Sequence, residues 1–556
     1  MPDVIKIYCE NNQSELFVNG GTSLQEVEKI LALQNDHPFI AAYVNNKLWE
    51  LNYRIYDSVS VRFIDITHFE GIRVYERTLF FTLDKAVHDL FPENNLTIKH
   101  SVSRGFYCEL EGMDKVGPEM VEKIKKRIAE LVEQDIPIVH QRLFTSEVEE
   151  LYTRMGYTDK LELLRTRPHL YEKVYSLGGV YGNFYGALAL STGALKLYDI
   201  RSYYNGFYLA GPDRRNPSKL VRMVPQDKMF DIFREYKQWV YVMGVSNIGS
   251  LNAKILGGKA SELIKIAEAF HEKKIATIAD TISEGNATRD VKLVFISGPS
   301  SSGKTTFAKR LSIQLGILGI QPLIISLDNY FVDREHTPKD KDGEYDYEAL
   351  EAIDVKAFNK DLKDLMVGKS VQLCSFDFKT GTRKYDGAEC KLQERGIVII
   401  EGIHGLNPKL TAEIDDKYKF KVYASALTSI SLDNLSRIST TDNRLLRRIV
   451  RDYHNRGASA LDTLRRWESV RRGEDAHIFP YQENADVMFN SSLFYEISVL
   501  RGYVEPLLHE IPDNVPEYGE ARRLLKFIDN FTPTVSDEIP PTSILREFIG
   551  GSSFEY

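Results

Sequence analysis

A glycine-rich segment in the second half of the chain has the residue types and spacing of a phosphate-binding loop. Residues 298–305 read GPSSSGKT, which matches the pattern GxxxxGK[ST]. In such a loop backbone N–H groups converge on phosphate oxygens, the lysine neutralises the terminal phosphates, and the hydroxyl after it is a ligand for Mg²⁺. We expect ATP or GTP to bind here with Mg²⁺, through Gly298, Ser300, Ser301, Ser302, Gly303, Lys304, Thr305 and Thr306.

Two carboxylates each follow an apolar run in the same half. Asp328 comes directly after residues 323–327, and Glu401 ends residues 396–401. The carboxyl ends of parallel strands deliver side chains to the ligand crevice of a sheet. We predict that Asp328 accepts the proton of an acceptor hydroxyl, and that Glu401 holds Mg²⁺ together with Thr305. The alternatives are an ordinary turn aspartate at 328 and an acid at 401 that caps the next element.

Residues 442–453 predict a helix with two different faces. Its apolar face carries Leu445, Leu446, Ile449, Val450 and Tyr453, and its other face carries Arg444, Arg447, Arg448 and Arg451. Arginines at this helical spacing suit a lid that closes over phosphates and stabilises the charge in transfer. We expect these four arginines to form such a lid. The alternative is a basic face that points into water.

The elements around these residues alternate between strand and helix from residue 288 onward. This alternation predicts an α/β domain over 288–500 with a mainly parallel sheet. A polar C-terminal tail over 501–556 follows, with a helix near 518–531. The expected strands are 292–297, 322–327, 371–376, 396–401, 420–424 and 485–490.

The first half of the chain has a different pattern. Short apolar strands and one helical stretch predict a small α+β module over residues 1–65. Residues 66–215 are mixed and predict a second domain. Residues 216–287 predict two or three helices that bridge the halves, with one apolar helix face over 259–277.

Composition narrows the classes of function. The formal net charge is −8 and the pI is near 5.9, which disfavours binding of nucleic acid by the whole chain. Four cysteines have no CxxC spacing, so neither a disulfide framework nor a zinc site is expected. The first residues do not show the basic segment followed by an apolar segment that is typical of a signal peptide. No long uncharged apolar run occurs in the sequence. We expect a cytoplasmic protein that does not enter the membrane.

The second half resembles the uridine kinase and phosphoribulokinase family of P-loop kinases over about residues 288–500. Five motifs in order carry the resemblance: GPSSSGKTT, SLDNYF, FDFKTGTR, IIEGIHGL and TDNRLLRRIVRDYHNRG. The resemblance implies transfer of the γ-phosphoryl of ATP or GTP to the 5′-hydroxyl of a nucleoside. It also implies Asp328 as the base, Glu401 as a magnesium partner, and Arg448 and Arg451 as contacts to phosphate.

The same resemblance implies which residues contact the acceptor. These would be Asp346, Phe376, Arg383 and Arg456. Two departures bear on the acceptor, because the family usually reads YDFxxHxR and ERGR where this chain has FDFKTGTR and NRGA. A site that lacks hydrogen-bonding groups cannot reject other bases by leaving those groups unpaired. A uridine- or cytidine-like acceptor is expected, and the base is left open.

The first half carries TSLQEV at 22–27, a helical pattern at 77–89, RGFYCEL at 104–110 and LSTG at 190–193. With these segments it resembles the TGS domain and the second additional domain of threonyl-tRNA synthetase over about residues 1–215. The resemblance implies a β-grasp fold over 1–65 and an editing-like domain over 66–215. Synthetase editing domains carry HxxxH and CxxxH pairs, and here the matching positions are Arg77, Phe81, Phe184 and Leu188. Without metal ligands or bases, hydrolysis of aminoacyl-tRNA is not expected. The domain is interpreted as a scaffold, an interaction surface or a regulatory sensor.

The function expected from these residues is that of a nucleoside kinase, and two alternatives stand beside it. One is a kinase of the same family that acts on another sugar hydroxyl. The other is a nucleotide-switched protein that binds RNA or the ribosome through its first half, which the net charge disfavours. The resemblance also implies a homo-oligomer.

Overall fold

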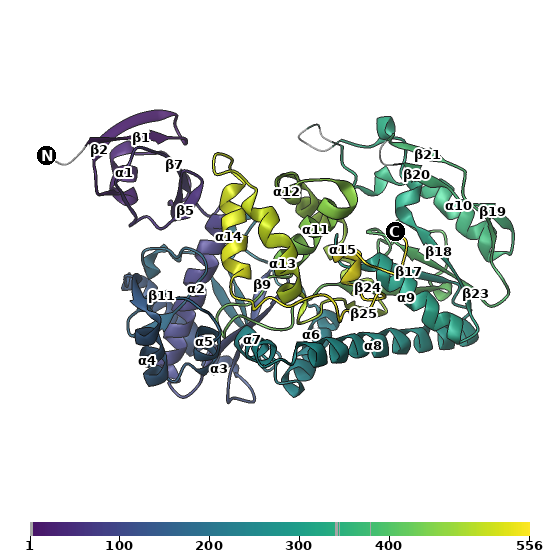
Figure 1. The fold of residues 1–556 in the computed structure, drawn as a ribbon, viewed down its shortest axis with the longest axis horizontal. Helices are drawn as coiled ribbons and strands as arrows, with labels where there is room; N and C mark the ends of the chain where they lie inside the picture. The colour runs from purple at the N-terminus through teal and green to yellow at the C-terminus, as the bar shows by residue number, and fades with distance from the viewer. Residues whose placement is uncertain (1–3, 340–342, 344, 378–379) are drawn as a thin grey trace.

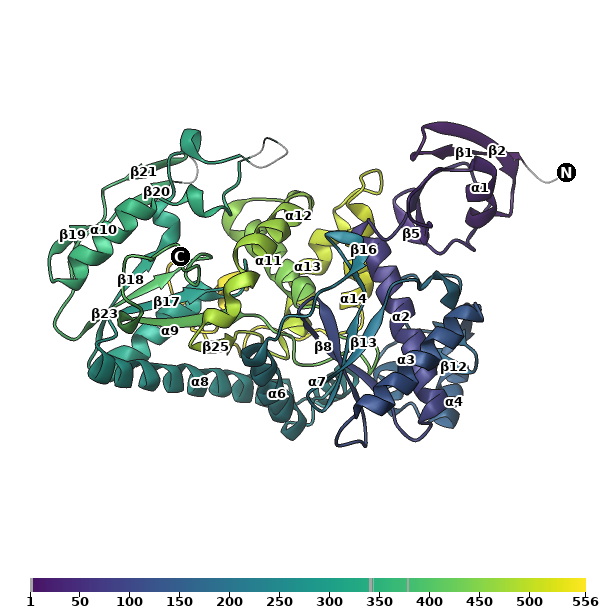
Figure 2. The same cartoon turned by 180° about the vertical axis from the view of Figure 1, so that it is seen from behind.

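The structure is a computed structural model that describes residues 4–339, 343, 345–377 and 380–556. The long helix α8, Ala260–Arg289, runs along one edge of the molecule between the N-terminal and C-terminal halves (Figures 1 and 2). Phe378 and Lys379 of the FDFKTGTR motif lie outside the described residues.

The first module is a five-stranded sheet with one helix. Its strand order is β2-β1-β7-β4-β5, and β1 and β7 are parallel neighbours. Every second residue of β1 is buried, which places Ile5, Ile7 and Cys9 in the core. Ser23 and Glu26 form a capping box at the start of α1. The elements are β1 Val4–Cys9, β2 Ser14–Asn19, β3 Thr22–Ser23, α1 Leu24–Leu31, β4 Ala41–Val44, β5 Lys47–Trp49, β6 Arg54–Ile55 and β7 Val59–Ile64.

The second module is built around the long helix α2, Phe69–Leu90, most of whose side chains are buried. A sheet of order β13-β14-β9-β8 and a sheet of order β10-β11-β12 belong to this module. The strands are β8 Leu96–Val102, β9 Gly105–Leu110, β10 Val139–Phe144, β11 Tyr171–Leu177, β12 Val180–Gly182, β13 Asp199–Tyr203 and β14 Gly206–Ala210, and the helices are α3 Pro118–Glu133, α4 Thr145–Met155 and α5 Thr158–Arg165. A short hairpin, β15 Pro212–Asp213 and β16 Asn216–Leu220, follows.

Three helices lead into the C-terminal half. They are α6 Asp227–Val242, α7 Ile248–Leu256 and α8. The sequence pattern predicts an end of the last of these near residue 277, whereas α8 continues to Arg289. Its second part stays buried because Ile275, Ile278 and Ile282 pack into the core beneath the C-terminal sheet.

The C-terminal half is a three-layer α/β unit with a fully parallel sheet of order β18-β23-β17-β24-β25. Alternate residues of the central strand β17 face two different cores, Val294 towards α8 and α9, and Phe295 towards α10. The strands are β17 Leu293–Ser297, β18 Gln321–Ser326, β23 Gly396–Glu401, β24 Lys419–Ser425 and β25 Val487–Asn490. The predicted parallel sheet is confirmed.

The strand predicted at 371–376 is wrong as a member of this sheet. The segment forms two three-residue strands in separate antiparallel pairs, β19 with β22 and β20 with β21. In β19 only the central residue, Val371, is buried. A parallel strand covered by helices on both faces needs a continuous buried run, as in β23, so this segment stays at the edge. The bounds are β19 Ser370–Gln372, β20 Ser375–Asp377, β21 Thr382–Lys384 and β22 Glu389–Lys391.

The C-terminal tail is part of the core, which corrects its description as polar. Ile544, Leu545 and Phe548 are fully buried and pack into the same cluster as the P-loop helix. The end of the chain lies beside β17 and α9 (Figure 1). The helices of this half are α9 Lys304–Ile317, α10 Val355–Met366, α11 Thr440–Arg456, α12 Ala460–His477, α13 Glu496–His509, α14 Tyr518–Ile528 and α15 Arg546–Ile549.

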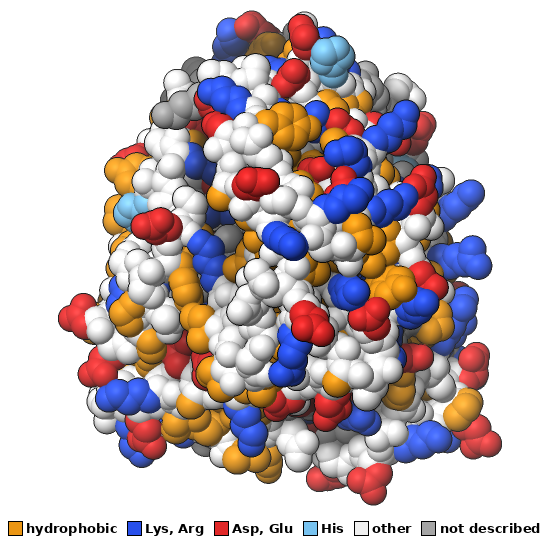
Figure 3. All heavy atoms as spheres, turned by 90° about the vertical axis from the view of Figure 1, so that its right-hand side faces the viewer, with side chains coloured by type: hydrophobic (Ala, Val, Ile, Leu, Met, Phe, Trp, Pro, Cys, Tyr) orange, Lys and Arg blue, Asp and Glu red, His pale blue; other side chains and the backbone are white. Residues whose placement is uncertain are grey.

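The surface at the end of the molecule that carries the parallel sheet is mixed in charge. Figure 3 shows Lys and Arg side chains interspersed with Asp and Glu across this face. Such a surface does not generate one extended field of a single sign. Within the described part of the chain, no helix combines the length and the apolar character needed to cross a bilayer.

Candidate active site

The glycine-rich segment joins β17 to α9, which is the strand-to-helix setting that the sequence predicts. Gly298 passes so close to β24 that a Cβ atom there would collide with the carbonyl oxygen of Ala424. Gly303, immediately before α9, has a φ of +77°. Both positions therefore require glycine, and together they fix the path of the loop.

Two serine hydroxyls of the loop have no hydrogen-bond partner among the described residues. These are Ser301 Oγ and Ser302 Oγ, and both are buried. Lys304 Nζ donates to Pro299 O at 3.2 Å. Buried polar groups without partners are costly, and the N-terminus of α9 adds positive potential. The loop is therefore suited to bind phosphate oxygens.

Asp328 and Glu401 meet at the carboxyl edge of the sheet. Ser326 of β18 and Glu401 of β23 are neighbours in the strand register, and Ser326 Oγ donates to Glu401 Oε1 at 3.0 Å. Burial raises the pKa of Asp328, although Lys304 and two arginines favour its carboxylate. Burial and the charge of Asp328 raise the pKa of Glu401 to about 7. The two carboxylates and the Lys304 ammonium form one interacting cluster.

The oxygen ligands at Glu401 fit Mg²⁺ that arrives with a nucleotide. No group of three or more His, Cys, Asp or Glu side chains able to hold a metal occurs among the described residues. Mg²⁺ keeps several waters and takes one or two carboxylates plus substrate phosphates. Thr305 and Glu401 supply oxygens of that kind, and a cation there would offset the negative charge that raises the pKa of Glu401.

The four arginines predicted to share one face of α11 as a lid over the phosphates divide into two pairs with different surroundings. The side chains of Arg444 and Arg447 are 1% and 0% exposed, and they form ion pairs with Glu474 of α12 and Glu496 of α13. Tyr453, assigned to the apolar face, is 45% exposed. The helix is buried on both sides because α12 and α13 supply carboxylates that neutralise the two guanidinium groups.

These two buried arginines hold the phosphate loop instead of closing over it. Arg444 Nη1 donates to Ser300 O at 3.1 Å, and Arg447 Nη1 donates to Ser301 O at 3.3 Å. Glu474 Oε1 accepts from Ser300 N at 3.0 Å. The loop backbone is thus bound on one side by charged groups that are themselves buried, which fixes its geometry before any ligand arrives.

Three other arginines of α11 gather around one carboxylate beside the loop. Arg448, Arg451 and Arg456 form ion pairs with Asp452 at 3.1, 3.3 and 3.5 Å. Arg448 Nη1 also donates to Ser300 Oγ at 2.9 Å. Three cations on one carboxylate leave net positive charge next to the loop, where anionic phosphates would be stabilised.

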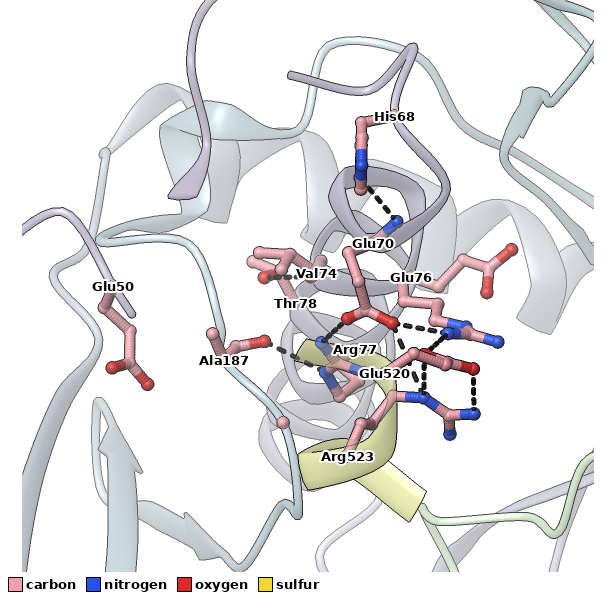
Figure 4. A network of polar contacts seen from close by, with 12 residues as sticks. Glu50, His68, Glu70, Val74, Glu76, Arg77, Thr78, Ala187, Glu520 and Arg523 are labelled. Atoms are coloured by element: carbon pink, nitrogen blue, oxygen red, sulfur yellow. Dashed lines mark hydrogen bonds and ion pairs between the residues drawn. The ribbon is translucent and has the colours of Figure 1, made fainter. Parts of the chain in front are cut away.

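The editing-like positions of the N-terminal half are filled by apolar and arginine side chains. Phe81 and Phe184 pack ring to ring with centroids 5.3 Å apart, and Leu188 is fully buried. Arg77 Nε donates to Ala187 O at 2.9 Å (Figure 4). These side chains provide no metal ligand and no general base, as the sequence predicts.

The comparisons with known proteins follow the same division. Residues 293–497 match the model of the Phosphoribulokinase / Uridine kinase family. Uridine kinase from Staphylococcus aureus is 29% identical over 197 residues, which are 35% of this chain and 86% of that protein. Residues 293–497 are a domain of this family.

The N-terminal region of the chain is similar to threonine–tRNA ligases. The ligase from Rubrobacter xylanophilus is 26% identical over 203 residues, which are 36% of this chain and 31% of that protein. The chain thus spans about a third of the length of that relative. A solved structure described as a possible uridine kinase from Bacillus stearothermophilus is 19% identical, covers 36% of this chain and 89% of that chain, and has a TM-score of 0.24.

Glu348 is a residue of the kinase-family domain that the sequence reasoning missed. Burial and the charge of Glu474 raise its pKa to about 7, while Arg448 and Lys304 favour its carboxylate and Asp328 disfavours it. It therefore lies among the groups of the cluster. Gly473 makes room for it, because a Cβ there would collide with the Glu348 side chain. No strand-end signal marks it in the sequence, because it lies in an irregular segment.

The predicted acceptor residues of the kinase-family domain lie in different surroundings. Asp346 is half-buried, and its carboxylate accepts from the backbone N–H of Glu348 at 3.1 Å. It is therefore next to a member of the charged cluster. Phe376 is buried with its ring 5.6 Å from that of Phe331. Arg383 Nη2 pairs with Asp354, at the start of α10, at 2.8 Å. Arg456 interacts with Asp328 electrostatically.

The end of the chain reaches the phosphate loop, which no sequence signal indicated. Glu547 Oε2 accepts from Thr306 Oγ1 at 2.6 Å, and the Tyr556 hydroxyl lies 2.9 Å from Thr306 Oγ1. A Cβ at Gly303 would press on the side chain of Ile544. Thr306 is therefore fully buried by residues some 240 positions away in the chain.

Proposed function

We propose that the C-terminal half transfers the γ-phosphoryl group of ATP or GTP to the 5′-hydroxyl of a nucleoside. The observation that carries the proposal is the cluster of charged groups at the sheet edge, in which the Asp328 carboxylate interacts with Lys304 of the phosphate loop and with arginines of α11. A base and a phosphate-binding cation in one site are the minimum that phosphoryl transfer to an alcohol requires. The family of the domain supports the reaction class.

Asp328 would act on the acceptor, and the loop on the donor. The acceptor oxygen forms a bond to the γ-phosphorus while the bond from that phosphorus to the β–γ bridging oxygen breaks. The hydroxyl proton passes to Asp328, whose raised pKa makes it a better base than an ordinary aspartate. Lys304 and the loop amides stabilise the charge on the phosphates. Mg²⁺ bound by Thr305 and Glu401 would supply further charge neutralisation.

Arg448 and Arg451 are proposed as contacts to the transferred group. Both are mostly buried and share Asp452 as their carboxylate, so a phosphate can compete for them with little rearrangement. Arg456, Asp346, Phe376 and Arg383 are kept as proposed acceptor contacts. Arg456 is the best supported of the four, because its positive charge favours the carboxylate form of Asp328.

A second candidate acceptor is a sugar hydroxyl outside the nucleosides. The observation in its favour is the surroundings of Phe376 and Arg383, where one side chain packs on Phe331 and the other pairs with Asp354. Groups engaged in this way offer a base few free hydrogen bonds, and specificity for a base depends on such groups. The N-terminal half is proposed to be a TGS-like module and a degenerate editing-like domain that act as a scaffold or sensor.

The proposal is tested by measuring nucleotide consumption with a panel of acceptors. The full chain is incubated with ATP or GTP and Mg²⁺, alone and with uridine, cytidine, adenosine, guanosine, inosine and a set of free sugars. Products are identified by mass spectrometry. We expect one nucleoside to stimulate consumption and to gain one phosphate. Stimulation by a sugar alone would move the assignment to the second candidate, and no stimulation by any acceptor would contradict both.

A further inference from the structure

A cavity of about 730 Å³ lies between the two halves and shares no lining residue with the phosphate-loop site. One wall is the edge strand β5 with the turn that follows it, a second is the sheet containing β10 and β11, and a third is α14 of the C-terminal half. Figure 4 shows Glu50 of the first wall and Arg523 of α14 on either side of the segment that carries Ala187. Its volume is in the range of small-molecule sites.

The lining of this cavity is cationic. Among its described lining residues, lysines and arginines outnumber carboxylates by eight to five. The carboxylates already have partners within the protein: Glu50 pairs with Lys173 at 2.6 Å, and Glu172 lies 3.3 Å from His169. Asp433 accepts from the backbone N–H of Ser436 at 2.7 Å. Arg523 is neutralised by Asp442 and Glu520, which lie outside the lining, and the remaining lysines and arginines still outnumber the carboxylates that line the cavity.

Two of the cations come from one face of α14 and have no ion-pair partner among the described residues. Arg522 and Lys526 are four residues apart, so their side chains lie on the same face of the helix. Lys526 is crowded by like charges, since burial and the neighbouring Lys173 and Arg522 lower its pKa. An anion placed between these groups would relieve the repulsion.

An aromatic pair lies in the wall opposite α14. Trp49 and Tyr53 stack with ring centroids 4.0 Å apart, and both line the cavity. Trp49 directly precedes Glu50, whose carboxylate binds Lys173, so the rings lie near the cationic cluster. A flat ring can stack on such a pair, because aromatic faces bind other π-systems with little demand on their substituents.

We propose that this cavity is a second ligand site that takes a nucleoside phosphate. The phosphate would bind Arg522, Lys526 and Lys173, and the base would stack on Trp49 and Tyr53. Cations alone would fit any small anion, and rings alone would fit any flat apolar molecule. Their combination in a cavity of this volume selects a molecule that has both groups.

The walls make the ligand a bridge between the halves. β5 and β11 belong to the N-terminal half and α14 to the C-terminal half. A molecule that binds all three walls stabilises the arrangement in which they meet, in proportion to its concentration over its dissociation constant. The proposal does not depend on the reaction proposed for the phosphate loop.

The test uses the fluorescence of Trp49 in the full chain, which has three tryptophans. The protein is titrated without Mg²⁺ with AMP, CMP, GMP and UMP, with the matching nucleosides, and with inorganic phosphate. At least one monophosphate should quench the fluorescence, and Trp49→Phe should abolish the quench. The double change Arg522→Ala and Lys526→Ala should weaken binding about tenfold or more, because two charge-assisted contacts are lost.

Two control variants distinguish binding in this cavity from binding at the phosphate loop and from a general effect of lost positive charge. Arg154→Ala removes an exposed arginine on α4 outside the cavity, and Lys304→Ala disables the phosphate loop. Both should bind the monophosphate within about twofold of the unchanged chain. Circular dichroism and thermal melting check that each variant is folded.

Four results would overturn the proposal. The first is no Trp49-dependent quench by any of the four monophosphates. The second is equal affinity in the chain with Arg522 and Lys526 replaced. The third is loss of binding in Lys304→Ala, which would place the nucleotide at the loop. The fourth is binding by inorganic phosphate as tight as by the monophosphates, or by short RNA far more tightly, which would make the ligand a simple anion or a polymer.

Discussion

Three carboxylates with raised pKa values distinguish the candidate site at the scale of single residues. Asp328, Glu348 and Glu401 are each driven towards the protonated form by burial, and each is partly held in the charged form by Lys304. Groups whose pKa is shifted by both burial and a specific partner are frequent at functional sites. The opposing influences give Glu348 and Glu401 pKa values of about 7 and leave the pKa of Asp328 raised above its ordinary value.

The pH dependence of turnover should report Asp328. Its pKa is raised in the folded protein, so kcat/KM should fall as the pH drops towards its raised pKa and the base becomes protonated. Glu348→Gln removes a negative charge that interacts with Asp328. The acidic limb of kcat/KM, measured between about pH 5 and pH 8, should therefore move to lower pH in this variant. A limb that moves to higher pH, or stays in place, would contradict the role of Glu348.

The same variant gives a stability prediction whose sign follows from linkage. The folded chain binds the Glu348 proton more tightly than the unfolded chain does, so this group makes the protein less stable as the pH rises from its ordinary pKa of 4.5 towards about 7. Glu348→Gln should raise the melting temperature at pH 8 and leave it nearly unchanged at pH 4. A lower melting temperature at pH 8 would be inconsistent with a carboxylate that is destabilised by burial.

Sequence reasoning located the strand-end carboxylates and missed the third. Asp328 and Glu401 follow buried runs, and parallel strands deliver such positions to one edge. Glu348 has no such signal: it approaches the loop because Gly473 of α12, more than a hundred residues away, leaves room for it. Contacts of that kind depend on tertiary packing, which local pattern does not encode.

At the scale of elements, the phosphate loop is held from outside by two of its neighbours. Helix α11 binds its backbone through Arg444 and Arg447, and the segment around α15 covers Thr306. The spacing of the arginines predicted the helix correctly. It did not predict that two of the arginines are buried against carboxylates of neighbouring helices. An arginine face has the same spacing whether it points to water or to carboxylates on α12 and α13.

Removal of one buried arginine should destabilise the kinase-family domain. Arg444→Ala removes the nearer guanidinium partner of the Glu474 carboxylate, which is 0% exposed, and leaves Arg471 at 3.8 Å. Breaking a buried pair in this way costs roughly 3–5 kcal/mol. Scanning calorimetry should show the transition of this domain lowered by at least about 5 °C.

An exposed arginine provides the matched control. Arg465→Ala on α12 removes a side chain that is 51% exposed and pairs with Glu517, and such surface pairs contribute at most about 1 kcal/mol. Equal effects of Arg444→Ala and Arg465→Ala would show that the buried pair does not hold the loop.

Glu547 should weaken nucleotide binding through its charge. Its carboxylate lies 2.6 Å from Thr306 Oγ1, at the start of the helix whose N-terminus faces the phosphates. Glu547→Gln keeps a hydrogen-bonding group of the same size and removes the negative charge. ATP affinity measured by calorimetry should rise about threefold or more, because a like charge beside the phosphate loop is removed.

Glu538→Gln is the control for this variant. Glu538 lies in the same C-terminal segment and is 46% exposed, and it pairs with Lys265. Its replacement should leave ATP affinity unchanged. A decrease of ATP affinity in Glu547→Gln would indicate that the carboxylate supports the loop more than it repels phosphate.

At the scale of the whole molecule, a buried ionic network joins the two halves. Arg523 of α14 binds Asp442 of α11 at 2.8 Å and lies 3.6 Å from Glu70 of α2. Arg73 of α2 binds Glu520 of α14 at 3.0 Å. Figure 4 shows Glu70, Glu520 and Arg523 side by side between the helices. The halves are therefore joined by ion pairs between α2 and α14 that add to the pairs within each half.

A backbone connection adds to this network. Ile98 N of β8 donates to Asn434 O at 2.8 Å, and Leu435 lies in the hydrophobic core of the N-terminal half. The sequence predicted the parallel sheet and the bridging helices because strand and helix periods are local signals. It contained no indication that residues 434–435 insert into the other half, because that contact joins segments more than three hundred residues apart.

Arg523→Ala should uncouple the halves. It leaves the buried Asp442 and the partly buried Glu520 with one partner fewer, at a cost of roughly 3–5 kcal/mol. Calorimetry without added ligand should show a lower melting temperature and two separated transitions, whereas Arg522→Ala, which removes an exposed side chain of the same helix that has no ion-pair partner among the described residues, should show neither. A single unshifted transition in Arg523→Ala would mean that the halves are held together by other contacts.

The proposed reaction depends on Asp328, which would take the proton of an acceptor hydroxyl that receives its phosphate from the nucleotide at Lys304. The most direct measurement compares acceptor-dependent nucleotide consumption by the unchanged chain and by Asp328→Asn, with nucleotide affinity measured on the same samples. We predict that turnover falls about a hundredfold or more in the variant, the range of general-base contributions, while nucleotide affinity stays within about threefold. Turnover that survives the substitution would contradict this role of Asp328.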